Sequence, residues 1–212
     1  MTGSYDFEEQ ERLAELKAWW EDNRWYVIGA IAAGLLAFSG YRGYHWWVQA
    51  KAEEAAAAYK PVSEAVTAKD AKKADEAAQK VIQQHPGSFY ASDAALVLAK
   101  DAFDAGNLEE ARKQLEWVMN NGADSHRGVA RVRLAGVLLE QKKYDDALKV
   151  LDGNKDEAYA PLVADMRGDI MLTQHRLDEA RANYKLAADK ADARNPVKGI
   201  AQTKLNALGG GQ

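Results

Sequence analysis

The side chains that could do acid–base or metal chemistry are four histidines, several pairs of neighbouring acids and a few serines. Metal binding by histidine needs two or more ligands at helical or turn spacing, such as His-x-x-x-His. No second histidine stands at that spacing from His45, His85, His126 or His175. We therefore expect each of them to be a surface histidine.

Nucleophilic and phosphate chemistry are disfavoured by the same kind of reasoning. Ser88 and Ser125 do not lie in a Gly-x-Ser-x-Gly sequence, and no Gly-rich loop could cradle a phosphate. The chain has no cysteine, which excludes disulfides, thiolates and cysteine-type zinc sites. A net charge of -4 without clustered Lys and Arg argues against a nucleic-acid surface. We expect no enzyme, no cofactor, no metal and no small-molecule substrate.

The paired acids belong to a repeated phrase, which points to the elements of the fold. Acids at the start of a helix interact favourably with its dipole, so we interpret these acids as stabilising the helix and not as catalytic groups. The closing alanines of the phrase are 34, 36 and 33 residues apart, and a period near 34 made of two helices is typical of tetratricopeptide repeats. The four copies are Ala74-Asp75-Glu76-Ala77, Leu108-Glu109-Glu110-Ala111, Tyr144-Asp145-Asp146-Ala147 and Leu177-Asp178-Glu179-Ala180.

Small residues stand where the two helices of such a repeat must approach closely, twelve positions before each closing alanine. We predict an all-α solenoid of about four tetratricopeptide-like repeats, closed by a capping helix from Pro196 to Leu208 with Ile200, Leu205 and Leu208 on its stripe. The predicted packing positions are Ala65, Ala77, Ala99, Ala111, Ala135, Ala147, Gly168 and Ala180.

The first helix of each repeat lines the concave side of a solenoid, where such scaffolds bind peptides or proteins. The repeat register turns a mostly apolar set of residues toward that side. For any single residue, packing against a neighbouring helix or the cap is the competing interpretation. The predicted groove for clients or partners consists of Leu96, Lys100, Phe103, Val129, Val132, Leu139, Leu162, Asp165, Asp169 and Leu172.

Seventeen residues from Trp25 to Tyr41 carry no charge, and Arg24 and Arg42 bound them. With a helical rise of about 1.5 Å per residue they cover roughly 26 Å, close to the apolar thickness of a bilayer. Two alternatives compete with a membrane span: a signal peptide cleaved near Ala37-Phe38-Ser39, and a buried core helix. The predicted interface residues are Trp25, Tyr26, Tyr41, Arg42, Trp46 and Trp47.

The predicted organisation has five parts. Three basic residues before the span against two after it leave the orientation nearly undetermined by charge. The parts are an acidic amphipathic segment over 1–24, a transmembrane helix over 25–48, a helical linker over 49–58, the repeat domain over 59–208 and a disordered tail over 209–212.

The chain resembles the YfgM family of ancillary SecYEG translocon subunits over nearly its whole length. The resemblance is carried by Lys17-Ala18-Trp19-Trp20, the Gly-spaced span ending Gly40-Tyr41-Arg42, Arg131-Val132-Arg133-Leu134-Ala135 and Val163-Ala164-Asp165-Met166-Arg167-Gly168-Asp169. It implies a single-span protein of the bacterial inner membrane, with its N-terminus in the cytoplasm and its repeat domain in the periplasm.

The resemblance also implies partners. They are the SecYEG translocon, a membrane-anchored chaperone like PpiD, unfolded exported chains and, for the cytoplasmic segment, a regulator of the Rcs stress response. We expect a non-enzymatic adaptor or holdase that passes exported chains to periplasmic chaperones. The alternative is a structural scaffold that tethers an envelope complex without binding unfolded clients. A soluble enzyme is a distant third, since no polar residues converge on one site.

Overall fold

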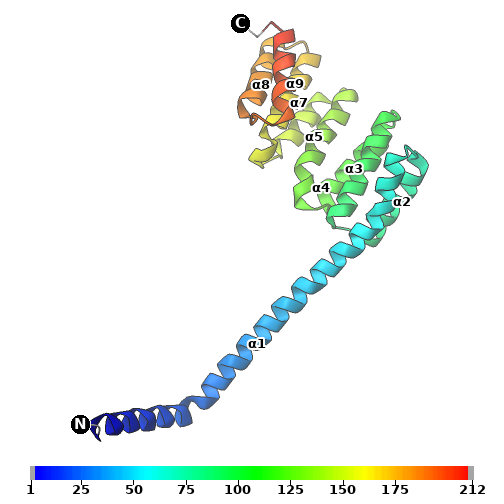
Figure 1. Cartoon of the computed structure of the whole chain (residues 1–212). Coiled ribbons are helices and arrows are strands. Elements are labelled where there is room, and N and C mark those ends of the chain that lie inside the picture. Colours follow the sequence, from blue (N-terminus) through cyan, green and yellow to red (C-terminus); the bar gives the residue numbers. More distant parts are fainter. Residues whose placement is uncertain (1–2, 210–212) are drawn as a thin grey trace. The chain divides into compact units, whose positions relative to one another are not determined.

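Every regular element in the described part of the chain is helical, which confirms the all-α prediction. The computed structural model describes the backbone of residues 3–209 and the side chains of residues 11–209 (Figure 1). The chain divides into two compact units between Lys51 and Ala52. The elements are α1 (Gly3–Thr67), α2 (Ala71–Gln84), α3 (Phe89–Asp104), α4 (Leu108–Asn121), α5 (Asp124–Glu140), α6 (Tyr144–Asp152), a 3-10 turn (Glu157–Tyr159), α7 (Ala160–Thr173), α8 (Leu177–Lys190) and α9 (Pro196–Ala207).

The second unit is a row of helix pairs followed by a closing helix, as a tetratricopeptide-like solenoid requires. Helix α3 packs on α4, α5 on α6 and α7 on α8, while α9 packs on both α7 and α8. The end of α1 completes the first pair, because Val62 is buried in one cluster with Ala78 and Val81 of α2. Neighbouring first helices also touch, α3 with α5 and α5 with α7, and a central cluster of buried residues extends from α3 to α7.

One turn conformation recurs between the two helices of every pair. The residue two positions before each second helix has a positive φ: 56° at Lys69, 75° at Gly106, 57° at Lys142 and 60° at His175. The amide of the next residue donates to a carbonyl five residues back, as Asp70 does to Ala65 at 2.9 Å and Asn107 to Ala102 at 2.8 Å. This hydrogen bond ends the first helix in the Schellman manner.

The recurring turn corrects the register of the first repeat. Four residues after the cap of each second helix lies a buried alanine: Ala111, Ala147 and Ala180 are fully buried, and in α2 the equivalent residue is Ala74. The prediction placed Ala77 there, but Ala77 is only half-buried. The partner position is accordingly Val62, fully buried, and not Ala65, which is also buried but one helical turn further on.

The other packing positions lie where the helices come close. Ala99, Ala111, Ala135, Ala147, Gly168 and Ala180 are all buried. Gly168 faces Tyr184 of α8, and a Cβ at position 168 would come closer than 3.0 Å to that ring. Tyr184 has no exposed surface.

The capping helix buries Leu205 as predicted, and Leu208 packs against the same cluster, but the rest of its stripe differs. Val197, Ala201 and Leu205 of α9 are buried, whereas Ile200 is 50% exposed. The prediction was therefore wrong at Ile200, which lies one residue off the stripe. The carbonyl of Leu208 accepts a hydrogen bond from Arg181 Nε at 2.7 Å, tying the end of the cap to α8. The predicted disordered tail lies outside the described residues, except for Gly209.

The N-terminal unit is helical, and its large apolar side chains are exposed: Trp25 by 72%, Tyr26 by 80% and Trp46 by 74%. Among the described residues, however, no helix contains a stretch that is both long and apolar enough to cross a membrane. The predicted transmembrane helix over 25–48 is thus not supported. The uncharged stretch is only seventeen residues long, and the glycine, serine, tryptophan and tyrosine residues within it lower its mean hydropathy.

Candidate functional site

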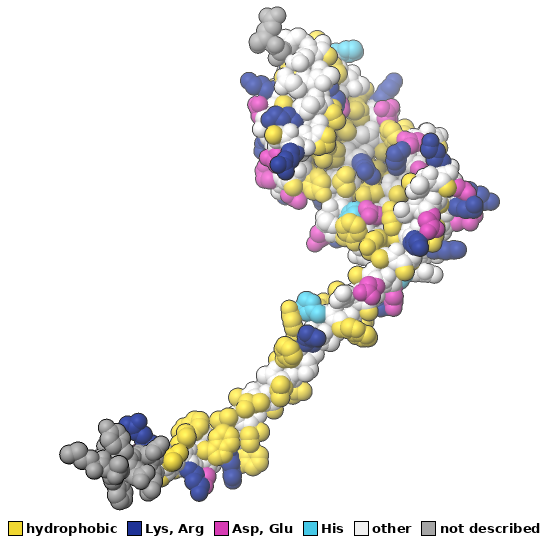
Figure 2. All heavy atoms as spheres, in the orientation of Figure 1, with side chains coloured by type: hydrophobic (Ala, Val, Ile, Leu, Met, Phe, Trp, Pro, Cys, Tyr) yellow, Lys and Arg dark blue, Asp and Glu magenta, His cyan; other side chains and the backbone are white. Residues whose placement is uncertain are grey.

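A pocket of about 330 Å³ opens between α3, α4 and α5. Its floor is apolar, because Ala99, Leu115 and Val137 are buried core residues. Phe103, which is 39% exposed, forms part of its wall. Gly136, which carries no side chain, completes the apolar lining. Figure 2 shows hydrophobic side chains gathered over the middle helices of the repeat domain, with Lys and Arg side chains beside them.

Two cations, Lys100 and Arg133, stand at this pocket. Lys100 pairs with Asp104, one helical turn further along α3. The hydrogen bond to that carboxylate raises the pKa of Lys100, and the nearby positive charge of Arg133 opposes the shift. Arg133 itself is exposed and has no ion pair or hydrogen bond with any side chain of residues 11–209.

The structure brings only part of the predicted groove to this surface. Lys100 and Phe103 line the pocket. Leu96 and Val132 are each only 7% exposed and belong to the central core, so they are not open groove residues. Four others are half-buried and pack against core clusters: Val129, Leu139, Leu162 and Leu172. Whether the exposed members bind clients stays a prediction.

The two predicted groove acids hold the capping helix. Lys204 of α9 donates to Asp165 Oδ2 at 2.8 Å and to both carboxylate oxygens of Asp169 at 2.7 and 2.8 Å. The hydroxyl of Tyr184 donates to Asp169 Oδ1 at 2.8 Å. Both carboxylates therefore bind partners within the protein. The repeat register could not predict this, because Lys204 lies on α9, which is not part of a repeat.

Burial and hydrogen bonding together shift the pKa values of this cluster. Burial raises the pKa of Asp165, because its second oxygen, Oδ1, is buried without a hydrogen-bond partner among the described residues. Burial also raises the pKa of the Tyr184 phenol, and the hydrogen bond to Asp169 adds to the shift. Burial lowers the pKa of Lys204, but the hydrogen bonds and the negative charges of Asp165 and Asp169 together outweigh this effect, so its pKa is raised.

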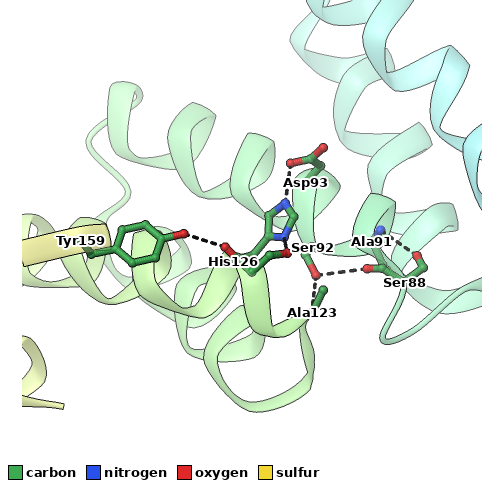
Figure 3. A network of polar contacts seen from close by, with 8 residues as sticks. Ser88, Ala91, Ser92, Asp93, Ala123, His126 and Tyr159 are labelled. Carbon is green, nitrogen blue, oxygen red and sulfur yellow. Dashed lines mark hydrogen bonds and ion pairs between the residues drawn. The ribbon is translucent and has the colours of Figure 1, made fainter. Parts of the chain in front are cut away.

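A second polar cluster, which the sequence did not reveal, joins α3 to α5 (Figure 3). His126 Nε2 lies 2.9 Å from Asp93 Oδ1, and its Nδ1 lies 3.0 Å from Ser125 Oγ. His126 is 6% exposed, so the prediction of a surface histidine was wrong for this residue. Its partner Asp93 lies 33 positions earlier, and no local pattern relates the two.

Ser125, His126 and Asp93 include the residue types of a catalytic triad, but their surroundings suit a structural role. The ring of Phe89 packs edge-on against His126 with 4.4 Å between centroids, which closes the imidazole off from solvent. A general base must reach the substrate proton within hydrogen-bond distance. Both ring nitrogens of His126 contact protein side chains, and the contact with Asp93 links α5 to α3.

Further hydrogen bonds extend this link in both directions, as Figure 3 shows. Ser92 Oγ accepts from the amide of Ala123 at 2.8 Å, which ties α3 to the start of α5. The hydroxyl of Tyr159 donates to the carbonyl of Ser125 at 2.7 Å. The ring of Tyr159 lies directly over Gly128, where a Cβ would come closer than 3.0 Å. The glycine is therefore required by the close approach of the next repeat.

The N-terminal unit presents the predicted interface residues on an exposed helix. Besides the three exposed aromatic residues already described, Tyr41 is 63% and Trp47 is 55% exposed, and Arg42 is exposed as well. The guanidinium of Arg24 lies 5.8 Å from the centre of the Trp25 ring, within the range of a cation–π contact. The side chains of the acidic residues before position 11 lie outside the described residues.

Comparison with known proteins identifies the architecture and its relatives. The family model described as "Tetratricopeptide repeat-like domain" matches residues 17–210. The protein "Ancillary SecYEG translocon subunit" of Neisseria gonorrhoeae (strain ATCC 700825 / FA 1090) is 32% identical over 203 residues, which cover 95% of this chain and 97% of that protein. The protein of the same name from Escherichia coli (strain K12) is 30% identical over 203 residues, covering 94% and 96%.

A solved structure supports the fold alone. "MamA 41-end from Desulfovibrio magneticus RS-1" superposes with a TM-score of 0.53 at 14% identity, covering 76% of this chain and 94% of that one. At this identity the likeness extends to the arrangement of helices and not to any site.

Proposed function

We propose that this chain, which belongs to the family of ancillary SecYEG translocon subunits with a tetratricopeptide repeat-like domain, is a non-enzymatic adaptor at the Sec translocon. The observation that carries the proposal is the extent of the likeness. It covers 97% of the Neisseria relative, so both the N-terminal unit and the repeat domain have counterparts there.

The repeat domain is the binding part of this adaptor, and the pocket beside Phe103 is its site. An exposed apolar pocket without convergent acid–base groups suits reversible binding of protein segments and not catalysis. Burial of apolar area at about 25 cal/mol per Å² supplies weak affinity without strict sequence specificity. The partners in our proposal are exported chains and a PpiD-like chaperone, as the resemblance implies.

The N-terminal unit holds the repeat domain at the membrane that contains the translocon. The support is the density of exposed aromatic and aliphatic side chains between Trp25 and Trp47, which would bury their surface among lipids. The resemblance implies that the repeat domain lies on the periplasmic side. A role of the acidic segment toward an Rcs regulator stays an expectation, since no described contact bears on it.

The proposal is tested by isolating the full-length, affinity-tagged chain from membranes dissolved in mild detergent. We expect the SecYEG translocon to co-purify with it. A variant in which Ile31, Leu35 and Phe38 are changed to Glu should be released from membranes by alkaline carbonate and should lose the translocon. Recovery of the unaltered chain without any translocon component would contradict the proposal, and recovery with the translocon but never with exported chains would favour the scaffold alternative.

A further inference from the structure

Residues 11–24 of α1 place three large apolar side chains on one side of the helix. At about 100° per residue, Leu13, Leu16 and Trp20 fall within an arc of about 60°, which we call the apolar stripe. Leu13 and Leu16 are each 61% exposed, and Trp20 is 44% exposed. Apolar side chains gathered on one side of a helix need an apolar surface to cover them.

The charged side chains of the same segment are also ordered around the helix. Arg12 borders the apolar stripe on one side, and Lys17 and Arg24 border it on the other, each within about 40° of a stripe residue. The acids occupy an arc of about 120° on the opposite side of the helix. They are Glu11, Glu15, Glu21 and Asp22. Cations therefore stand next to the apolar stripe on both of its borders, and the acids stand away from it.

This order of side chains matches the layers of a phospholipid surface, which are acyl chains, then phosphates, then water. A helix lying in that plane buries its apolar side about 5–10 Å into the boundary between headgroups and acyl chains. Long basic side chains beside the buried stripe reach up to the phosphates. Trp19, next to Arg12 on the helix, would lie among the headgroups, where indoles are enriched. A protein groove has no layer of phosphates that would select cations on both borders of the stripe.

We propose that residues 11–24 form a surface helix in the plane of a phospholipid bilayer, with the apolar stripe among the acyl chains and the three bordering cations paired with lipid phosphates. This inference rests on the proposed attachment of the N-terminal unit to a membrane, and it adds a lipid contact before Trp25. Because the segment holds three cations and four acids, burial of apolar area drives the contact, and anionic lipid is not required.

Spin labels on single introduced cysteines measure the depth of each position, since the chain has no cysteine of its own. The full-length protein is reconstituted in vesicles of phosphatidylcholine, with and without phosphatidylglycerol. The accessibility of each label to oxygen and to a water-soluble nickel complex then gives its depth. We expect the label in Leu16→Cys to lie about 5–10 Å below the phosphates in both kinds of vesicle. The label in Ala18→Cys, on the acidic side of the helix, should lie in water.

Two charge variants test the part played by the cations. Arg12→Glu lowers the net charge by two and places an acid among the phosphates, so the label at position 16 should move into water. Ala14→Glu combined with Ala18→Glu lowers the net charge equally on the far side of the helix, and should leave that label at its depth. Circular dichroism checks that each variant keeps its helical content.

A third label, in Leu35→Cys, separates failure of the surface helix from failure of membrane attachment. If position 35 lies among lipids while positions 16 and 18 both lie in water, attachment stands and the surface helix is refuted. If position 35 also lies in water, the proposed attachment fails with it. Equal burial of positions 16 and 18, or equal effects of the two charge variants, would overturn the inference as well. Dipolar broadening between labels at position 16 would instead identify a second copy of the chain as the occupant of the stripe.

Discussion

Gly168 offers the sharpest test of how the paired helices pack. An alanine at this position would place its Cβ closer than 3.0 Å to the ring of Tyr184, a separation that real Cβ atoms essentially never show. The ring cannot move aside freely, because it has no exposed surface and its hydroxyl donates to Asp169 at 2.8 Å. Gly168→Ala must therefore push α7 and α8 apart or break that hydrogen bond.

Two opposing effects determine the size of the change. Alanine is favoured over glycine inside a helix by about 1 kcal/mol. Overpacking a close contact costs about 1–3 kcal/mol, and a lost hydrogen bond to a charged group costs about 1.5–3 kcal/mol. We expect Gly168→Ala to lower the free energy of unfolding by about 1–2 kcal/mol. Gly199→Ala in α9 is the matched control: no atom lies within 4 Å of its added Cβ, so stability should rise by about 0.5–1 kcal/mol.

The assay is urea unfolding of the full-length protein in detergent, followed by circular dichroism. A double variant, Gly168→Ala with Tyr184→Leu, assigns the cause, because the smaller leucine leaves room for the new methyl group. The coupling between the two changes should then be about 1–3 kcal/mol in favour of the pair. Equal and stabilising effects at positions 168 and 199, or the absence of any coupling, would refute the packing described for α7 and α8.

Three further predictions concern the turns, the cap and the buried histidine. Lys142 has a φ of 57°, so Lys142→Gly should stabilise the chain by about 1 kcal/mol. Gly106 has a φ of 75°, so Gly106→Ala should destabilise the chain by a similar amount. If urea unfolding shows changes of the same sign for both variants, the two turns are not equivalent. The raised folded pKa of Lys204 means that its contribution is complete below the ordinary value of 10.5 and is lost as the pH rises through the folded value. The raised phenol pKa of Tyr184 adds to the loss of folding stability from about pH 10 upward. Lys204→Met should therefore make the free energy of unfolding fall less steeply above that pH. An unchanged fall would contradict the role assigned to Lys204. His126→Ala should lower the free energy of unfolding by about 2–3 kcal/mol, because it leaves the half-buried Asp93 without its partner. Lys185→Ala should lower it by less than about 0.5 kcal/mol. Similar losses for the two variants in thermal unfolding would argue against the link between α3 and α5.

The repeat period could be predicted because the packing of paired helices imposes it on the sequence. Ala111, Ala147 and Ala180 are fully buried at equivalent places, so their spacing in the sequence equals the length of one structural repeat. The first repeat was misread because its copy of the phrase, Ala74-Asp75-Glu76-Ala77, has an alanine at both ends. The prediction used Ala77, whereas the buried position is Ala74, one helical turn earlier.

The site was harder to predict because its residues are placed by contacts between distant segments. A helical stripe shows which residues face inward, but not whether a neighbouring helix covers them, as happens at Leu96 and Val132. Asp169 was assigned to the groove because Lys204, its partner, lies 35 positions later on the cap. Arg133 was not assigned to the groove for the same reason, since its place beside Phe103 follows from the stacking of α3 and α5.

The central claim, that the pocket beside Phe103 receives exported chains at the translocon, is tested most directly by photo-crosslinking in intact cells. A photoreactive phenylalanine analogue replaces Phe103 in the full-length chain while an exported protein is arrested during translocation. The same analogue at the exposed position of Lys185 on α8 is the control. We predict adducts with the arrested chain from position 103 and none from position 185. Adducts from neither position, or equal adducts from both, would contradict the claim.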